Sequence, residues 1–115
     1  MPTHGDAAAH NLLAATGGLR LLDWDRAAMA DPARDLAHLA ATLWARDVVL
    51  GRPESWSALA TLLNSYARRR EPPYPVTLEV YRVCALVRIA HGWTEFRTSP
   101  ERAAPLLAEA ERLLR

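Results

Sequence analysis

The chain has 115 residues, half of them hydrophobic and 23% charged, with a formal net charge of +1. This length accommodates one domain, spanning residues 1–115. The balanced charge gives no electrostatic case for nucleic acid or an anionic membrane as a partner, and no apolar run approaches the ~20 residues of a membrane span.

Residues 1–30 are expected to form a loop, a β-hairpin and a second loop. Proline, glycine and polar residues interrupt any periodicity before residue 12. Two short apolar segments then flank Thr16-Gly17-Gly18, whose glycines supply positive φ at little steric cost. Antiparallel pairing of these segments would bring Asn11 and Asp23, at the open end of the hairpin, close together.

Residues 31–115 are expected to form a helical subdomain of about four helices. The first begins at Asp31-Pro32, because aspartate is a preferred N-cap and proline is tolerated in the first turn, and it ends near Asp47. Apolar spacing predicts a second helix over about residues 56–70. Three prolines between residues 72 and 75 form an extended connector.

A third helix is expected from Val76 to His91, with Gly92 ending it and an aromatic loop over residues 93–96. Its apolar residues cover most of its circumference, which predicts a central and mostly enclosed helix. Cys84 lies within this pattern and is expected to be a buried structural thiol. As the only cysteine, it also favours a cytoplasmic setting.

The last segment contains Pro105, which would remove a helical hydrogen bond and clash with the preceding turn. We therefore predict a short turn at residues 100–103 and a regular helix from about Ala104.

The chemistry of the chain is expected in the loops that precede the first helix. Asp6 is followed five positions later by Asn11, and Asp23 comes just after the hairpin. One carboxylate can act as a general base, while the amide and the second carboxylate offer the hard oxygen ligands that magnesium needs around a phosphate. This spacing is typical of a phosphoryl-transfer site.

Three blocks carry a family resemblance in the same order. They are His4-Gly5-Asp6 with Asn11, then Leu22-Asp23-Trp24-Asp25, then Asp31-Pro32-Ala33-Arg34-Asp35-Leu36-Ala37. Together they resemble the aminoglycoside phosphotransferase and choline kinase-like family, which has a protein-kinase-like fold. The resemblance covers residues 3 to about 44.

The resemblance implies a role for each of three residues. Asp6 would be the catalytic base that orients the acceptor hydroxyl, and Asn11 and Asp23 would be magnesium ligands. The implied cofactors are Mg²⁺ and ATP or another nucleoside triphosphate, and the implied partner is a small molecule with a hydroxyl group. The activity would be transfer of the γ-phosphate to that hydroxyl.

Four further residues are expected to support the site. His4 should hydrogen-bond the loop backbone, and Asp25 should face the metal or the solvent. Asp31 should cap the first helix, and Asp35, one turn later, should brace the catalytic loop.

The chain departs from the family pattern in three places. The family commonly has leucine, an aromatic residue or histidine, proline and glycine where this chain has Ala7-Ala8-Ala9-His10, and Ala30 replaces a glycine. The family's N-terminal nucleotide lobe, with its phosphate-covering loop and strand lysine, has no counterpart, since the chain contains no lysine. The expected fold is α+β and mainly α, forming part of a kinase-like C-terminal lobe that would be inactive alone.

Two other functions are compatible with the sequence. A noncatalytic helical module would use an exposed apolar face to self-associate or to bind a missing lobe. A metal-dependent hydrolase would bind zinc or manganese through His4, Asp6 and His10, because imidazole and carboxylate ligands suit those metals.

The acceptor is left open by the sequence. A polycationic aminoglycoside would require a pocket lined by carboxylates, for which the helical part offers only scattered acids such as Glu71, Glu79 and Glu95. Trp93 and Phe96 could pack against a ligand ring or close the hydrophobic core.

Overall fold

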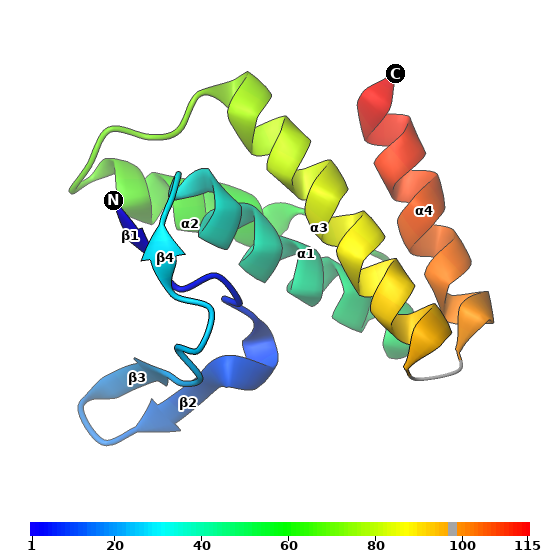
Figure 1. The fold of residues 1–115 in the computed structure, drawn as a ribbon, viewed down its shortest axis with the longest axis horizontal. Helices are drawn as coiled ribbons and strands as arrows, with labels where there is room; N and C mark the ends of the chain where they lie inside the picture. The colour runs from blue at the N-terminus through cyan, green and yellow to red at the C-terminus, as the bar shows by residue number, and fades with distance from the viewer. Residues whose placement is uncertain (97–98) are drawn as a thin grey trace.

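The computed structural model describes residues 1–96 and 99–115 and has an α+β fold that is mainly helical (Figure 1). The expected fold class is confirmed at that level. The helices are α1 (Ala33–Val49), α2 (Ser57–Ala67), α3 (Pro75–Glu95) and α4 (Pro100–Leu114). The strands are β1 (Pro2–Thr3), β2 (Leu12–Ala15), β3 (Gly18–Leu21) and β4 (Ala28–Met29), with a 3₁₀ turn, η1, at Ala9–Asn11.

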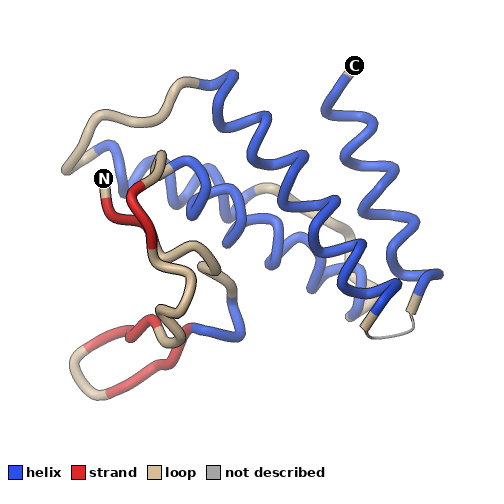
Figure 2. The backbone as a smooth tube through the Cα atoms, viewed as in Figure 1, coloured by secondary structure: helices blue, strands red, loops and turns tan. Residues whose placement is uncertain are grey.

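The predicted hairpin is confirmed as the antiparallel pair β2–β3, and Figure 2 shows it standing apart from the helices. Its register pairs Leu12 with Leu21 and Ala15 with Gly18, so the turn consists of two residues. Gly17 has φ 92°, a value that favours glycine. Because no helix covers it, apolar side chains of the hairpin such as Leu19 are exposed.

The prediction of an irregular loop over residues 1–11 is wrong at its two ends. Strand β1 pairs with β4 in a second small antiparallel sheet, and the Thr3 hydroxyl donates to the carbonyl of Ala28 at 3.0 Å. Residues 9–11 form η1. The β1–β4 pairing joins segments about 25 residues apart, so no local pattern in the sequence indicated it.

The helical core is built around α1, which contacts each of the other three helices (Figure 1). Its buried face is rich in alanine, which lets the helix axes approach closely. Trp44 of α1, Leu86 of α3 and Leu106 of α4 are the large side chains that fill the main cluster. A smaller cluster packs α1 against Leu59 of α2 and Leu78 of α3.

The expected end of the third helix at Gly92 is wrong, because α3 continues to Glu95. The N–H of Phe96 still donates to the carbonyl of Gly92 at 2.9 Å. A glycine inside a helix costs about 1 kcal/mol relative to alanine. Trp93, the next residue of the helix, belongs to the main core cluster, and its burial offsets the cost.

The predicted turn at residues 100–103 is also wrong, since α4 begins at Pro100 and includes Pro105. Proline at position 105 has no N–H to donate to the carbonyl of Glu101. The helix nevertheless runs through this position because Ala103, Leu106 and Ala110 all pack into the main core cluster. Tertiary packing thus overrides the local preference here.

Helix α3 is not enclosed, and Cys84 is not buried. Val76, Val80 and Val87 have exposed fractions of 72%, 56% and 45%, and Cys84 is exposed on the same side. The spacing of these four residues places them in one row along the helix. No other element in the described part of the chain packs over this row, so both predictions are corrected.

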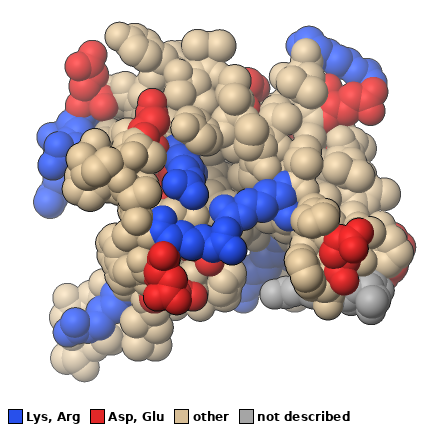
Figure 3. Space-filling model, viewed as in Figure 1, with Lys and Arg blue, Asp and Glu red and all other residues tan. Residues whose placement is uncertain are grey.

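Charged side chains are spread over the surface, and basic ones gather across the middle of the face seen in Figure 3. Among the described residues, no helix is long and apolar enough to cross a membrane.

Candidate functional site

The loop that carries Asp6 passes against the backbone of Arg26. Gly5 has φ 85°, and a Cβ atom at this position would lie 2.2 Å from the carbonyl oxygen of Arg26. Both the backbone conformation and the close approach therefore require glycine.

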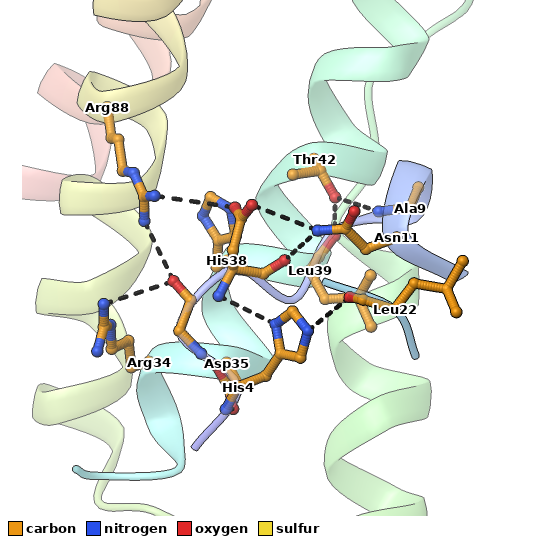
Figure 4. A network of polar contacts seen from close by, with 12 residues as sticks. His4, Ala9, Asn11, Leu22, Arg34, Asp35, His38, Leu39, Thr42 and Arg88 are labelled. Carbon is orange, nitrogen blue, oxygen red and sulfur yellow. Dashed lines mark hydrogen bonds and ion pairs between the residues drawn. The ribbon is translucent and has the colours of Figure 1, made fainter. Parts of the chain in front are cut away.

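Asp35, in the first turn of α1, binds the backbone of this loop through its carboxylate (Figure 4). Its Oδ2 accepts the N–H of His4 at 2.6 Å, and its Oδ1 accepts the N–H of Gly5 at 2.9 Å. From the other side, Arg34 and Arg88 each donate to the carbonyl of Gly5 at 3.4 Å. The peptide before Asp6 is thus fixed by groups from both α1 and α3.

His4 is buried and has both ring nitrogens engaged by the backbone. Its Nδ1 accepts the N–H of Asp6 at 3.1 Å, and its Nε2 donates to the carbonyl of Leu22 at 2.8 Å, which assigns the Nε2–H tautomer. Trp24 packs edge-on against the ring, with 4.5 Å between centroids. His4 therefore joins the Asp6 loop to the segment after the hairpin.

The contacts of His4 show that the metal site predicted for a metal-dependent hydrolase is wrong. Neither nitrogen of His4 has a lone pair left for a metal, and His10 lies on η1. Across residues 1–96 and 99–115, no group of three or more histidine, cysteine, aspartate or glutamate side chains could hold a metal ion.

The carboxylate of Asp6 lies where three side chains converge, and only 24% of its side chain is exposed. Its Oδ1 lies 3.2 Å from Nε2 of His38 and 3.8 Å from Nη2 of Arg88. Its Oδ2 accepts from the amide nitrogen of Asn11 at 3.3 Å, and the same nitrogen donates to the Asp6 carbonyl at 2.9 Å. The structure therefore brings Asp6 and Asn11 together.

His38 was not predicted as a site residue. Burial lowers its pKa below 6.5, and the positive charge of Arg88 lowers the pKa further, while Asp6 partly opposes both effects. The ring is therefore neutral near pH 7 and can donate a hydrogen bond to Asp6 without adding charge. It lies one turn after Asp35 on α1, on a polar row that continues to Thr42.

This polar row is the feature of the sequence from which His38 and Thr42 could have been predicted. The hydroxyl of Thr42 accepts the N–H of Ala9 at 3.3 Å and donates to the carbonyl of Leu39 at 2.7 Å, so it anchors η1 to α1. This row of polar residues lies beside the apolar face of α1 and marks the side that meets the loop.

Arg88 had no comparable signal, because it comes from α3, more than 80 residues after Asp6. Burial, followed by the charge of Arg26, lowers the pKa of its guanidinium from its ordinary value. The group stays charged at physiological pH, and it sets the electrostatic potential next to Asp6.

The remaining predicted site residues lie near the loop or at the start of α1. Asp23 has φ 60° and is exposed; it follows Leu22, whose N–H donates to the Asn11 carbonyl at 2.8 Å. The exposed Asp25 and Asp23 form no hydrogen bond or ion pair with other described residues. Asp31 was expected to cap α1, but the N-cap is Pro32; Asp31 precedes it, and its Oδ1 accepts the N–H of Ala33 at 2.8 Å.

A cavity of about 540 Å³ opens beside Asp6, between η1, the second half of α1 and the end of α3. Its polar lining comes from Asp6, His10, His38, Thr42, Arg46 and Arg88. Its apolar side includes Trp93 and Phe96, whereas none of the three glutamates considered from the sequence lines it. Its volume is that of a site for a small molecule.

Comparison with known proteins gave one match. A family model described as the phosphotransferase enzyme family matches residues 1–77, more than half of the chain. Neither the curated proteins nor the solved structures include a match to it.

Proposed function

Because this chain belongs to the phosphotransferase enzyme family, we propose that its site transfers the γ-phosphate of ATP to the hydroxyl group of a small molecule. In this proposal Asp6 orients the acceptor hydroxyl, and Asn11 with Asp23 holds Mg²⁺. The single observation that carries it is the position of Asp6, bonded to Asn11 and facing a cavity of about 540 Å³.

Asp6 has the surroundings that an orienting base needs. His38 donates to one carboxylate oxygen and Asn11 to the other, which restricts the rotation of the side chain. Each oxygen can accept more than one hydrogen bond, so the carboxylate can also receive an acceptor hydroxyl. Phosphoryl transfer is catalysed mainly by positioning and by neutralisation of charge, which is what these contacts supply.

The donor chemistry near the hairpin fits Mg²⁺. The amide nitrogen of Asn11 is turned toward Asp6, which leaves its carbonyl oxygen as the ligand atom. The carboxylate of Asp23 is exposed and forms no hydrogen bond or ion pair with the described residues. Both are hard oxygen donors, and a bound ion would neutralise charge on the phosphoryl group.

We also propose that these 115 residues supply the acceptor and metal side of a kinase-like C-terminal lobe and need a nucleotide-holding part from outside them. The chain contains no lysine to pair with the nucleotide phosphates. Turnover by the chain alone should therefore be negligible.

A calorimetric titration with Mn²⁺, used as a probe for Mg²⁺, tests the metal site in the whole 115-residue chain. Asp23→Asn should weaken Mn²⁺ binding about tenfold or more, because it removes a charged ligand. Asp25→Asn is the matched control, since it removes the same charge two residues away, and it should change the affinity by less than about twofold. Equal effects of the two substitutions would contradict the assignment of Asp23.

A second candidate function is a noncatalytic interaction module, and the exposed row Val76, Val80, Cys84 and Val87 favours it. Large exposed apolar surfaces commonly mark a partner. Light scattering coupled to size exclusion tests this candidate. A stable dimer that Val80→Ser converts to a monomer would support the module, whereas a monomer at all concentrations would contradict self-association through this row.

A further inference from the structure

The charged groups that line the cavity beside Asp6 carry a net positive charge. Arg46 from α1 and Arg88 from α3 contribute two positive charges, against the single negative charge of Asp6. Arg46 is exposed, and its side chain forms no ion pair or hydrogen bond with the residues that the structure describes. The cavity therefore presents a cation with no anionic partner.

The guanidinium of Arg88 also forms only weak polar contacts. Its distances to the Gly5 carbonyl and to the Asp6 carboxylate are 3.4 Å and 3.8 Å, longer than the 2.7–2.9 Å of a strong charge-assisted bond. Both contacts leave most of the planar, five-donor guanidinium able to bind another oxygen anion. A side chain that is 40% exposed can do so without a change in the fold.

Further positive charge surrounds Arg88. Arg26 and Arg34 act on it electrostatically, and burial together with the Arg26 charge lowers the pKa of its guanidinium. A smaller cavity of about 180 Å³, lined by Arg34, lies on the other side of Arg88. Converging cations repel one another in a partly buried site, and a bound anion would relieve that repulsion.

The far side of the cavity is apolar. Ile89, Trp93 and Phe96 of the α3 end face Val49 near the end of α1. Phe96 is 80% exposed, so an aromatic surface stands open at this side of the cavity. A ligand with a ring or a short hydrocarbon chain would cover it.

A polycation does not fit these surroundings. Glu79 is paired with Arg82, and no carboxylate other than Asp6 lines the cavity among the described residues. Two guanidinium groups would repel an amine-rich acceptor, and the single carboxylate of Asp6 would not offset that repulsion.

We propose that the acceptor of this site is an anionic hydroxyl compound with an apolar body, whose carboxylate binds Arg88 and Arg46 while its hydroxyl meets Asp6. This inference rests on the proposed phosphotransferase function and names the substrate class of the same cavity.

Calorimetric binding to the whole chain, without metal or nucleotide, tests the proposal. Phenyllactate is the probe, because it combines a carboxylate, a hydroxyl and a ring. Phenylpropanediol is its uncharged counterpart with the same skeleton, and kanamycin is a polycationic alternative. Phenyllactate should bind about tenfold more tightly than the diol, and added salt should reduce this difference. Kanamycin should bind more weakly than either.

Two substitutions test whether the carboxylate of phenyllactate binds the two arginines. Arg88→Gln and Arg46→Gln should each weaken the binding of phenyllactate about fivefold or more, and Arg46→Gln should leave the binding of the diol unchanged. Arg20→Gln, on the exposed strand β3, removes the same charge outside the cavity and should have no effect. The side chain of Arg46 forms no hydrogen bond or ion pair with the described residues, so its variant stays informative if Arg88→Gln impairs folding.

Three outcomes would overturn the proposal. They are equal affinities for phenyllactate and the diol, tighter binding of kanamycin, and displacement of phenyllactate by inorganic phosphate that binds more tightly. The last outcome would assign the arginines to a nucleotide phosphate. The Mn²⁺ titration is independent of these measurements, so a failure of the metal site is distinguishable from a failure of anion binding.

Discussion

At the residue scale, some of the side chains that contact Asp6 could be predicted from the sequence and others could not. The spacing of Asp6 and Asn11 in one loop was enough to predict that they act together, because both follow from a short motif. His38 could have been found from the polar row of α1, one turn after Asp35. Arg88 could not, since its contact with Asp6 depends on how α3 packs against α1.

The environment of His38 predicts how stability depends on pH. Burial and the charge of Arg88 hold its pKa below the unfolded value of about 6.5. Between these two pKa values the unfolded chain binds more protons, so the free energy of unfolding falls as the pH drops below about 6.5.

We expect His38→Gln, which cannot titrate, to reduce the decrease in melting temperature between about pH 7.5 and pH 5. Thermal denaturation followed by circular dichroism measures this slope. His10→Gln is the control, because that imidazole is exposed on η1, and its slope should match that of the unmodified chain. An unchanged slope for His38→Gln would contradict a buried neutral imidazole.

The close approach at Gly5 gives a second prediction. Gly5→Ala should destabilise the fold by about 2 kcal/mol or more, because its Cβ would overlap the backbone of Arg26 in addition to the strain of a positive φ. Gly17→Ala, at φ 92° with open space around it, should cost only about 1 kcal/mol. Chemical denaturation compares the two, and equal losses would mean that the loop does not lie against Arg26.

At the element scale, the hairpin and the four helices could be predicted because turn residues and apolar periodicity mark them locally. The pairing of β1 with β4 could not, since it joins distant two-residue strands. The two errors in helix limits, at Gly92 and at Pro105, have one cause. Both residues disfavour a helix locally, but Trp93 and Leu106 beside them are buried in the core.

The course of α3 through Gly92 predicts a stabilising substitution. Gly92→Ala should raise the free energy of unfolding by about 0.5–1 kcal/mol, since the residue is helical and a Cβ meets no atom within 4 Å. Gly51→Ala, also in open space but at φ 65°, should instead destabilise the chain. If Gly92→Ala destabilised the chain as Gly51→Ala does, the helix would end at residue 92.

At the scale of the whole molecule, the fold is mainly helical and carries its polar site where the loop between β1 and η1 meets α1 and α3. Apolar residues around α3 predicted an enclosed helix, but periodicity cannot tell whether a partner covers each face. The row from Val76 to Val87 is exposed in the structure. A cytoplasmic setting stays a prediction.

The proposal of a partial site predicts weak nucleotide binding. Calorimetry with ATP and Mg²⁺ should give a dissociation constant no tighter than about 1 mM for the isolated chain, because no lysine is present to hold the phosphates. Binding in the micromolar range that requires Mg²⁺ would contradict the need for a nucleotide-holding part outside these residues.

The position of the metal ion tests the central claim most directly. Addition of substoichiometric Mn²⁺ to the ¹⁵N-labelled chain broadens the amide signals nearest the ion. We predict that the signals of Asn11, Leu22 and Asp23 broaden first, that Asp23→Asn abolishes this selectivity, and that signals of α4 stay sharp. Broadening centred on other carboxylates, with the signals of Asn11 and Asp23 unaffected, would contradict a phosphoryl-transfer site at this loop.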